Sequence, residues 1–440
     1  MSMNGEINLK IGAYKLNIEK LMPFLCMIST YKTFLNYYKF IVPSLEAVWV
    51  LLYNLITLFL LVAYVPIFFM LIKNARKSKN MIPAIIIPTM VCFNILLAAI
   101  EANGIEVLSR SYRIPNADGT NDEFGYYFSQ INVWFGNMSL LTLLATFVNK
   151  KKTIIKCVVY SMAVMVLPII VILIMNPSAI GVRQSDFVEQ NITFGGGLWN
   201  IGVIGFGSLA WLGMALMNKA TKWQKRFILF SVVLFLFVGI AGISRTLILM
   251  ALFSFAYFVL ASKKKTSFIF KTAIILAILG VAIVIEWELV SKVLERFTGE
   301  DSGTNNVRFS LWQTYLSYFK DYWLFGAPLG NVYKYYLETD LIGEHFLPHS
   351  AILNFLVRFG IIACLAYLSL VKGAFFNRRT IDNRSVYIKA GGIAYITLAF
   401  INQTGYAETI FYIMFGLLLA YGKINLAEHK NENRNNNENR

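Results

Sequence analysis

Four charged or titratable residues stand apart from the rest of this sequence, because each lies in a segment that separates two apolar runs. They are Arg183, Arg245, Arg308 and His349. An arginine guanidinium binds phosphate through two parallel hydrogen bonds and keeps its charge at every physiological pH. A neutral imidazole accepts a proton. The four residues therefore predict anion binding beside acid–base chemistry.

Arg245 gives the clearest signal, because the tripeptide Ser244-Arg245-Thr246 interrupts the long apolar stretch 227–261. This stretch is too long for a single membrane crossing, so we predict two short helices with their turn within 239–246. An unpaired cation at such a turn is costly. We interpret Arg245 as a phosphate ligand at the membrane boundary. The alternative is a side chain that reaches the lipid headgroups. For Arg183, a phosphate ligand and an ordinary surface residue remain equally open.

His349 stands at the end of a polar stretch, between Pro348 and an apolar helix that starts at or just after it. The positive end of that helix favours the neutral imidazole over the charged form. A neutral imidazole can act as a general base, so His349 is the candidate catalytic residue. The alternative is a histidine that only caps the helix or contacts headgroups.

The polar stretch itself carries an aromatic stripe. Arg308, Trp312 and Tyr315 fall on one face of a predicted helix over 306–320, which we place along the membrane surface. Trp312 and Tyr315 are candidate glycan-binding residues, although such a stripe more often packs against protein. Glu408, near the last predicted outer turn, is a third candidate, and a structural role is as well supported.

The elements that must position these residues are membrane helices. The chain has 440 residues, of which 57% are hydrophobic and 15% are charged. Its apolar runs are long enough to cross about 30 Å of hydrocarbon and are continuous rather than alternating. We predict an all-α polytopic membrane protein with about twelve transmembrane helices. The predicted helices are 19–42, 46–72, 81–101, 124–148, 155–176, about 195–217, two within 227–261, 267–286, 350–371, 386–403 and 407–423.

Charge follows the same organisation. The net charge of +16 comes from lysines and arginines that gather in short stretches between the apolar runs. Cytoplasmic loops have this bias, so the charge does not indicate nucleic-acid binding. Both termini are predicted to be cytoplasmic, with Arg183, Arg245 and the polar insert together on the outer face.

The predicted domain organisation follows from these helices. Residues 1–423 form one integral membrane domain, and 286–349 form an extracytoplasmic loop between the ninth and tenth helices. Residues 424–440 are predicted to be a disordered cytoplasmic tail, because they are polar and of low complexity. Three histidines and four dispersed cysteines provide no cluster that predicts a metal site or another cofactor.

With these residues placed, the chain resembles the O-antigen ligase and polymerase superfamily over about 180–371. The matching features follow one another in order along the sequence. They are Arg183, Gly195-Gly196-Gly197 with Asn200, Ser244-Arg245-Thr246, Arg308-x-x-x-Trp312, Phe325-Gly326-Ala327-Pro328-Leu329-Gly330, Pro348-His349-Ser350 and Gly360. The family usually has His-Asn where this chain has His349-Ser350, which leaves the role of the second residue open.

The resemblance implies a metal-independent, cofactor-free glycosyltransferase on the extracytoplasmic face of the cytoplasmic (inner) membrane. Its donor would be a glycan linked to polyprenyl (undecaprenyl) diphosphate, and its acceptor a sugar hydroxyl. By this resemblance His349 would deprotonate the acceptor, Arg183 and Arg245 would hold the diphosphate, and Arg308 would position the donor or order the insert. A flippase and a chain-length regulator would be partners, beside the bilayer itself.

We favour a polymerase that builds a surface polysaccharide, such as O-antigen, capsule or exopolysaccharide, from lipid-linked repeat units. The alternative within the superfamily is a ligase that moves finished glycan to a lipid core or a protein. A lipid-linked oligosaccharide flippase or another transporter is a third interpretation. A transporter is expected to show an internal repeat between its halves, and the sequence shows none.

Overall fold

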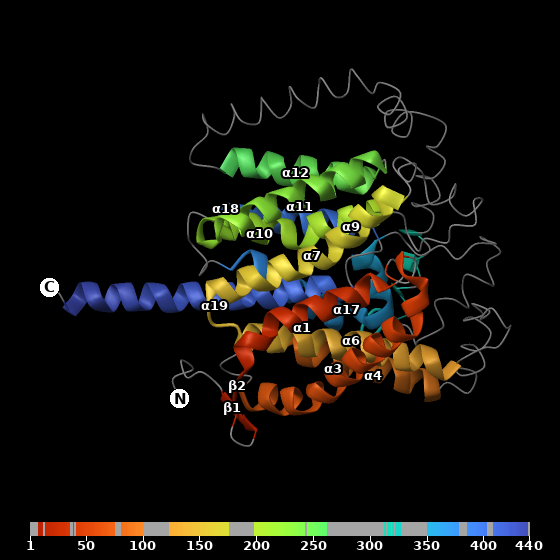
Figure 1. Ribbon diagram of the computed structural model, residues 1–440. Coiled ribbons are helices and arrows are strands. Elements are labelled where there is room, and N and C mark those ends of the chain that lie inside the picture. The colour runs from red at the N-terminus through yellow and green to blue at the C-terminus, as the bar shows by residue number, and fades with distance from the viewer. Residues whose placement is uncertain are drawn as a thin grey trace.

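The computed structural model describes most of the chain as packed helices (Figure 1). The described residues are 8–11, 14–35, 38, 41–74, 81–100, 123–175, 198–242, 244–261, 312–313, 315–317, 319–320, 322–326, 350–377, 385–402 and 408–438. The predicted ninth helix, 267–286, lies outside them.

The helices follow the predicted order closely. They are α1 (Ile18–Thr33), η1 (Pro43–Leu45), α3 (Glu46–Asn74), α4 (Pro83–Ile100), α6 (Glu123–Phe147), α7 (Lys151–Met175), α9 (Leu198–Gly205), the π-helical turn η4 (Phe206–Ala210), α10 (Trp211–Leu216), η5 (Met217–Lys219), α11 (Lys222–Ala241), α12 (Arg245–Ala261), α17 (Ala351–Phe375), α18 (Ser385–Ile401) and α19 (Thr409–Glu438). Two short strands precede them, β1 (Asn8–Ile11) and β2 (Tyr14–Asn17), which pair as an antiparallel hairpin. The prediction of an all-α chain missed this hairpin, which lies ahead of the first helix.

Length and composition support a membrane protein. Six described helices are long and apolar enough to span a bilayer, namely Pro43–Lys73, Lys151–Met175, Leu198–Lys219, Lys222–Ala241, Ala351–Phe375 and Thr409–Glu432. Four shorter apolar helices join them, at Pro83–Leu97, Ile131–Phe147, Arg245–Ala261 and Val386–Ile401. A polytopic helical membrane protein is thus confirmed, and the total of about twelve spans stays a prediction.

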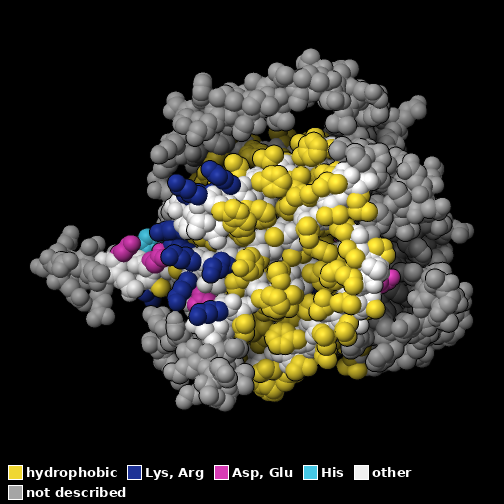
Figure 2. All heavy atoms as spheres, in the orientation of Figure 1, with side chains coloured by type: hydrophobic (Ala, Val, Ile, Leu, Met, Phe, Trp, Pro, Cys, Tyr) yellow, Lys and Arg dark blue, Asp and Glu magenta, His cyan; other side chains and the backbone are white. Residues whose placement is uncertain are grey.

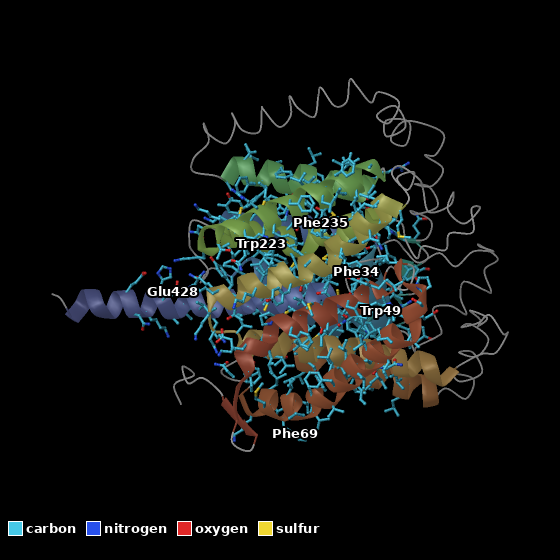
Figure 3. All side chains as sticks on the ribbon, in the orientation of Figure 1. Phe34, Trp49, Phe69, Trp223, Phe235 and Glu428 are labelled. Carbon is cyan, nitrogen blue, oxygen red and sulfur yellow. The ribbon has the colours of Figure 1, made fainter. Side chains whose placement is uncertain are left out.

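The surface separates into an apolar belt and a basic end (Figure 2). Hydrophobic side chains cover the middle of the visible face, while lysine and arginine side chains gather where α19 leaves the bundle. Figure 3 shows how individual aromatic residues contribute: Phe69 and Trp223 are 66% and 63% exposed, whereas Phe34 and Phe235 are buried between helices. Because such exposed rings are favourable in lipid and costly in water, the belt marks the bilayer-facing surface.

The hairpin of α11 and α12 confirms the predicted turn. α11 starts with a capping box, in which Thr221 and Gln224 satisfy each other's backbone N–H groups. It ends at Gly242, and the Ser244 hydroxyl accepts a hydrogen bond from Leu247 N at 3.3 Å to start α12. A side chain at Gly242 would meet Trp199 Cβ at 2.3 Å, so glycine here lets the start of α9 pack against the turn.

α18 runs antiparallel to α12 in the centre of this half of the bundle. The Phe258 and Tyr387 rings lie 4.5 Å apart near the end of α12 and the beginning of α18. Near the opposite ends of these helices, Met250 and Leu398 both approach Gly207. The end of α18 therefore lies at the same side of the bundle as the beginning of α12.

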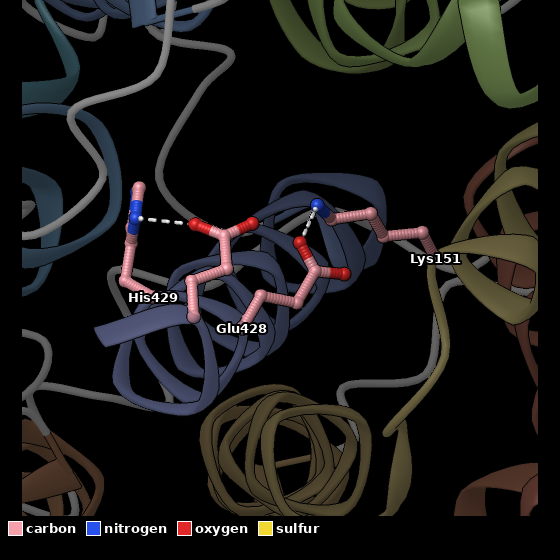
Figure 4. Close-up of polar contacts among 4 residues, drawn as sticks. Lys151, Glu428 and His429 are labelled. Carbon is pink, nitrogen blue, oxygen red and sulfur yellow. Dashed lines mark hydrogen bonds and ion pairs between the residues drawn. The ribbon is translucent and has the colours of Figure 1, made fainter. Parts of the chain in front are cut away.

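α19 corrects one prediction, because it continues as helix to Glu438 where we expected a disordered tail over 424–440. The extension projects beyond the bundle (Figure 1). Lys151 Nζ lies 2.5 Å from Glu428 Oε2, and His429 Nδ1 lies 3.5 Å from Glu432 Oε2 one turn farther along (Figure 4). These two pairs support the helix, whereas the many asparagines of the segment are poor helix formers.

Lys423 joins α19 to the end of α6. Its ammonium group donates to Ala145 O at 3.0 Å, Thr146 O at 2.9 Å and Asn149 Oδ1 at 2.9 Å, and so satisfies carbonyl groups that the helix leaves unpaired.

We expect Lys423→Met to lower the free energy of unfolding by about 1.5–3 kcal/mol, because it removes charge-assisted hydrogen bonds from a half-buried site. Thermal unfolding of the detergent-solubilised protein measures this. Lys430→Met, at an exposed position of the same helix, is the matched control. Equal melting temperatures for the two variants would show that Lys423 contributes nothing beyond an exposed lysine.

Candidate functional site

The described residues include Arg245, Trp312, Tyr315 and Glu408 among those predicted to form the site. Arg183, Arg308 and His349 lie outside them. The segments that adjoin these three residues are described in part, and they show which helix ends come together.

The first such place is the start of α17, directly after His349. Ser350 is the N-cap, and its hydroxyl accepts a hydrogen bond from Leu353 N at 3.3 Å. Its carbonyl accepts from Asn354 N at 3.0 Å. The role that the sequence left open for the residue after His349 is thus helix capping, which serine performs well. The helix starts where the sequence predicted it.

The end of α18 meets this start. Ala351 N donates to Asn402 O at 2.9 Å, so the first residue of α17 is bonded to the residue that follows α18. The connection 403–407 then leads to Glu408, whose carbonyl accepts from Phe411 N at 3.1 Å in the first turn of α19. Glu408 and the segment after His349 therefore belong to neighbouring helix ends.

Arg245 is the first residue of α12 and stands at this same end of the bundle, because α12 and α18 are antiparallel. The start of α9, which follows the loop of Arg183, packs on the turn before Arg245 through the contact of Trp199 with Gly242. Helices α9, α12 and α17 thus begin where α18 ends. Helix N-termini carry partial positive charge, so this end of the bundle favours an anion.

The described part of the insert helix packs one aromatic face on α17, and its predicted placement along the membrane surface stays a prediction. Trp312 is half-buried, and Tyr315 is 1% exposed and packs on Val357 of α17. Phe319, Tyr322 and Leu353 surround this contact. The described residues of 312–322 are helical, as predicted. The burial of Tyr315 favours packing over sugar contact, and glycan binding by Trp312 stays a prediction.

The insert continues as a turn that packs against α4 and α17, with Trp323 and Phe325 53% and 36% exposed. Trp323 O accepts a hydrogen bond from Ile361 N at 2.9 Å, and Phe325 O accepts one from Asn94 Nδ2 of α4 at 2.8 Å. Both bonds lie beside the interruption of α17 at Gly360. The extracytoplasmic placement of 286–349 stays a prediction, and helices α4 and α17 supply bonding partners for carbonyl groups of the described turn 322–326.

A buried polar face leads from the start of α17 to this turn. Ser350, Asn354 and Arg358 recur every four residues and are 4%, 0% and 8% exposed. Asn94 on α4 is also fully buried. Buried polar and ionisable groups in a membrane protein are costly and tend to serve function.

The sequence analysis missed Asn94 and named Gly360 only as a matching feature of the resemblance. Asn94 was readable as a polar residue within the apolar stretch 81–101. This signal does not indicate the partner of Asn94. The contact of Asn94 with Phe325 joins positions separated by 231 residues.

Comparison with known families gives one match. Residues 230–368 match the family model of the O-antigen ligases. This range contains Arg245, Arg308 and His349, whereas Arg183 and Glu408 fall outside it. The chain has no match among curated proteins. The match over this region supports the resemblance of this integral membrane protein to the O-antigen ligase and polymerase superfamily.

Proposed function

We propose that the protein is a polymerase that extends a surface polysaccharide from repeat units linked to a polyprenyl diphosphate. The family match supports an enzyme of the ligase and polymerase type. The observation that carries the proposal is the meeting of three helix beginnings with the end of α18, where Arg245 and the residue after His349 both stand.

The proposed reaction is a displacement at the anomeric carbon of the donor glycan. An acceptor hydroxyl oxygen forms the new bond to this carbon, and its proton passes to the His349 imidazole. The bond between the anomeric carbon and the diphosphate oxygen breaks, and the diphosphate leaves with the electron pair. Because the diphosphate is already a good leaving group, the chemistry requires no nucleotide, metal or other cofactor.

The charge that develops on the leaving diphosphate needs fixed positive groups. Arg245 supplies a guanidinium at the start of α12, and the N-terminal ends of α9, α12 and α17 add partial positive charge at the same end. Arg183 and Arg308 are proposed to complete this diphosphate site. Trp312 and Glu408 are proposed to contact sugar, with Tyr315 as their packed support.

The acceptor separates the polymerase from the ligase. Purified protein in liposomes is supplied with a lipid-linked repeat unit, and the products are separated by size. Chain growth without any added acceptor supports the polymerase, whereas transfer that requires a lipid-core or protein acceptor supports the ligase. Movement of the donor across the bilayer without new glycosidic bonds would instead show a transporter and overturn the proposal.

We expect Arg245→Ala to lower transfer by about 10²–10³-fold, because it removes a donor that stabilises the leaving group. Arg245→Lys should restore only part of the rate, since an ammonium lacks the guanidinium's planar fork. Arg226→Lys and Arg226→Ala, on the exposed opposite end of α11, are the matched controls. If Arg245→Ala retains the wild-type rate, Arg245 reaches headgroups rather than the diphosphate.

A further inference from the structure

α17 consists of two helical halves separated at Gly360. This glycine has φ 74° and ψ 179°, values outside the helical range. In a continuous helix Ile361 N would donate to a carbonyl of the preceding turn. Here it donates to Trp323 O of the insert at 2.9 Å. Gly360 therefore separates the half-helix 351–359 from the rest of α17, and a turn of the insert bonds to α17 at this break.

The turn that fills this break comprises residues 322–326 and is held on its other side by α4. Gly326 N donates to Tyr322 O at 2.9 Å and closes the turn. Asn94 Nδ2 donates to Phe325 O at 2.8 Å and to Met90 O at 3.0 Å. The Phe93 and Phe325 ring centroids lie 4.8 Å apart. We call the turn 322–326, Gly360 and Asn94 together the docking joint.

The docking joint leaves no space between its two backbones. A Cβ atom at Gly326 would lie 2.4 Å from Arg358 O, and a Cβ atom at Gly360 would lie 2.3 Å from Leu324 O. Each glycine thus faces the backbone of the other segment. The turn fits only while it stays in register with the break, and the Asn94 side chain holds it there from α4.

The half-helix 351–359 is anchored at both ends and along its sides. Its first residue bonds to Asn402 O, and its last turn meets the docking joint. Trp134 of α6 packs with its ring centroid 5.3 Å from Phe355 and 5.1 Å from Phe359. The Phe355 ring also stacks on Tyr367 in the second half of α17, with centroids 4.9 Å apart. Because Gly360 interrupts the helix, the position of the half-helix depends on these side-chain contacts as well as on the chain itself.

We propose that Asn94 is a positioning residue for the transfer reaction. By holding Phe325 O it keeps the turn in the break of α17, and so determines where the half-helix and the preceding His349 stand relative to Arg245. Asn94 contacts none of the reacting groups. Its effect on catalysis rests on the proposed function, whereas its effect on the half-helix does not.

The test compares Asn94→Leu with Thr89→Val in the full-length protein in liposomes. Both substitutions remove a side-chain donor from α4, but the Thr89 hydroxyl bonds only to Ile85 O of its own helix. In Asn94→Leu, hydrogen exchange of the amides of Gly326 and Ile361 should accelerate about tenfold or more, because a buried hydrogen bond across the joint is lost. Thr89→Val should exchange like the wild type.

The second measurement is the rate at which diethyl pyrocarbonate modifies each histidine, read by mass spectrometry. We expect the rate at His349 to change by at least about threefold in Asn94→Leu, because its supporting half-helix is loosened. His429, on the projecting part of α19, serves as the internal reference. The third measurement is transfer, where kcat should fall about tenfold or more with the donor KM unchanged, as expected for a misplaced base.

These readouts separate the two proposals. Unchanged exchange and unchanged His349 modification in Asn94→Leu would overturn the positioning role, whatever the enzyme does. Altered modification with an unchanged kcat in an active enzyme would also overturn it. A wild-type protein that transfers no glycan overturns the proposed function alone, since the first two measurements still decide whether Asn94 positions the half-helix. If Asn94→Leu does not insert into the membrane, Asn94→Ala takes its place, because it also removes the amide donor and adds no bulk.

Discussion

Replacing His349 with alanine is expected to lower glycosyl transfer by about 10²–10⁴-fold, the contribution of a positioned general base. The acceptor hydroxyl would then have to lose its proton to water while it attacks. Binding of the lipid-linked donor should persist, because the diphosphate ligands are unaffected. Transfer of a labelled repeat unit by the purified variant in liposomes measures the effect, with donor binding determined on the same preparation.

His429→Ala is the matched control for this substitution. His429 lies on the projecting part of α19 beside Glu432, far along the chain from the candidate site. Its removal should leave the transfer rate at the wild-type value. A His349→Ala protein that is properly inserted and still produces polymer of normal length and amount would exclude His349 as the base.

Substituting alanine for Gly360 is expected to have the largest effect on stability. Its backbone conformation, φ 74° and ψ 179°, is one that residues other than glycine adopt only at a cost of about 1–3 kcal/mol. The new Cβ atom would also meet Leu324 O at 2.3 Å and Gly326 N at 2.5 Å. Both contacts are with backbone atoms, so the turn 322–326 must leave the break in α17. We expect a lower apparent melting temperature together with faster hydrogen exchange at Gly326.

Gly136→Ala provides the comparison for Gly360→Ala. The added methyl group at Gly136 would meet Leu60 Cβ at 3.6 Å, an ordinary contact distance, and alanine favours the helical conformation there. This variant should melt at or above the wild-type temperature. Equal melting temperatures for Gly360→Ala and Gly136→Ala would show that the interlocked glycines are dispensable for stability.

Several features of the fold could be predicted because they depend on local sequence. The hairpin of α11 and α12 is an example: 227–261 is too long for one span, and Gly242 and Ser244 mark the only break. The start of α17 is another, since proline before His349 and an apolar run after it define a helix boundary. The structure of the C-terminal segment was harder to predict. Its polar composition alone does not reveal that α19 continues into it as far as Glu438.

The neighbours of the candidate site could be predicted only in part. The predicted topology indicated that Arg245 and the start of α17 lie at the same end of the bundle. In the structure the end of α18 links them, because Asn402 O bonds to Ala351 N and α12 begins beside it. An aromatic stripe in a polar stretch is consistent with a surface helix and with packing against protein, so the sequence left the contacts of this helix open. The structure shows Tyr315 buried against Val357.

Hydropathy and short motifs are local properties, so the sequence by itself predicted a helical membrane protein that resembles the O-antigen ligase and polymerase superfamily. Only the tertiary structure showed that the described turn 322–326 of the polar insert packs against α4 and α17. One of the bonds that hold it there, from Ile361 N to Trp323 O, joins two backbone groups, which residue type does not reveal. The other runs from the Asn94 side chain to Phe325 O, and the sequence shows the polar residue without its partner. Two glycines make room for the contact, because they have no side chains.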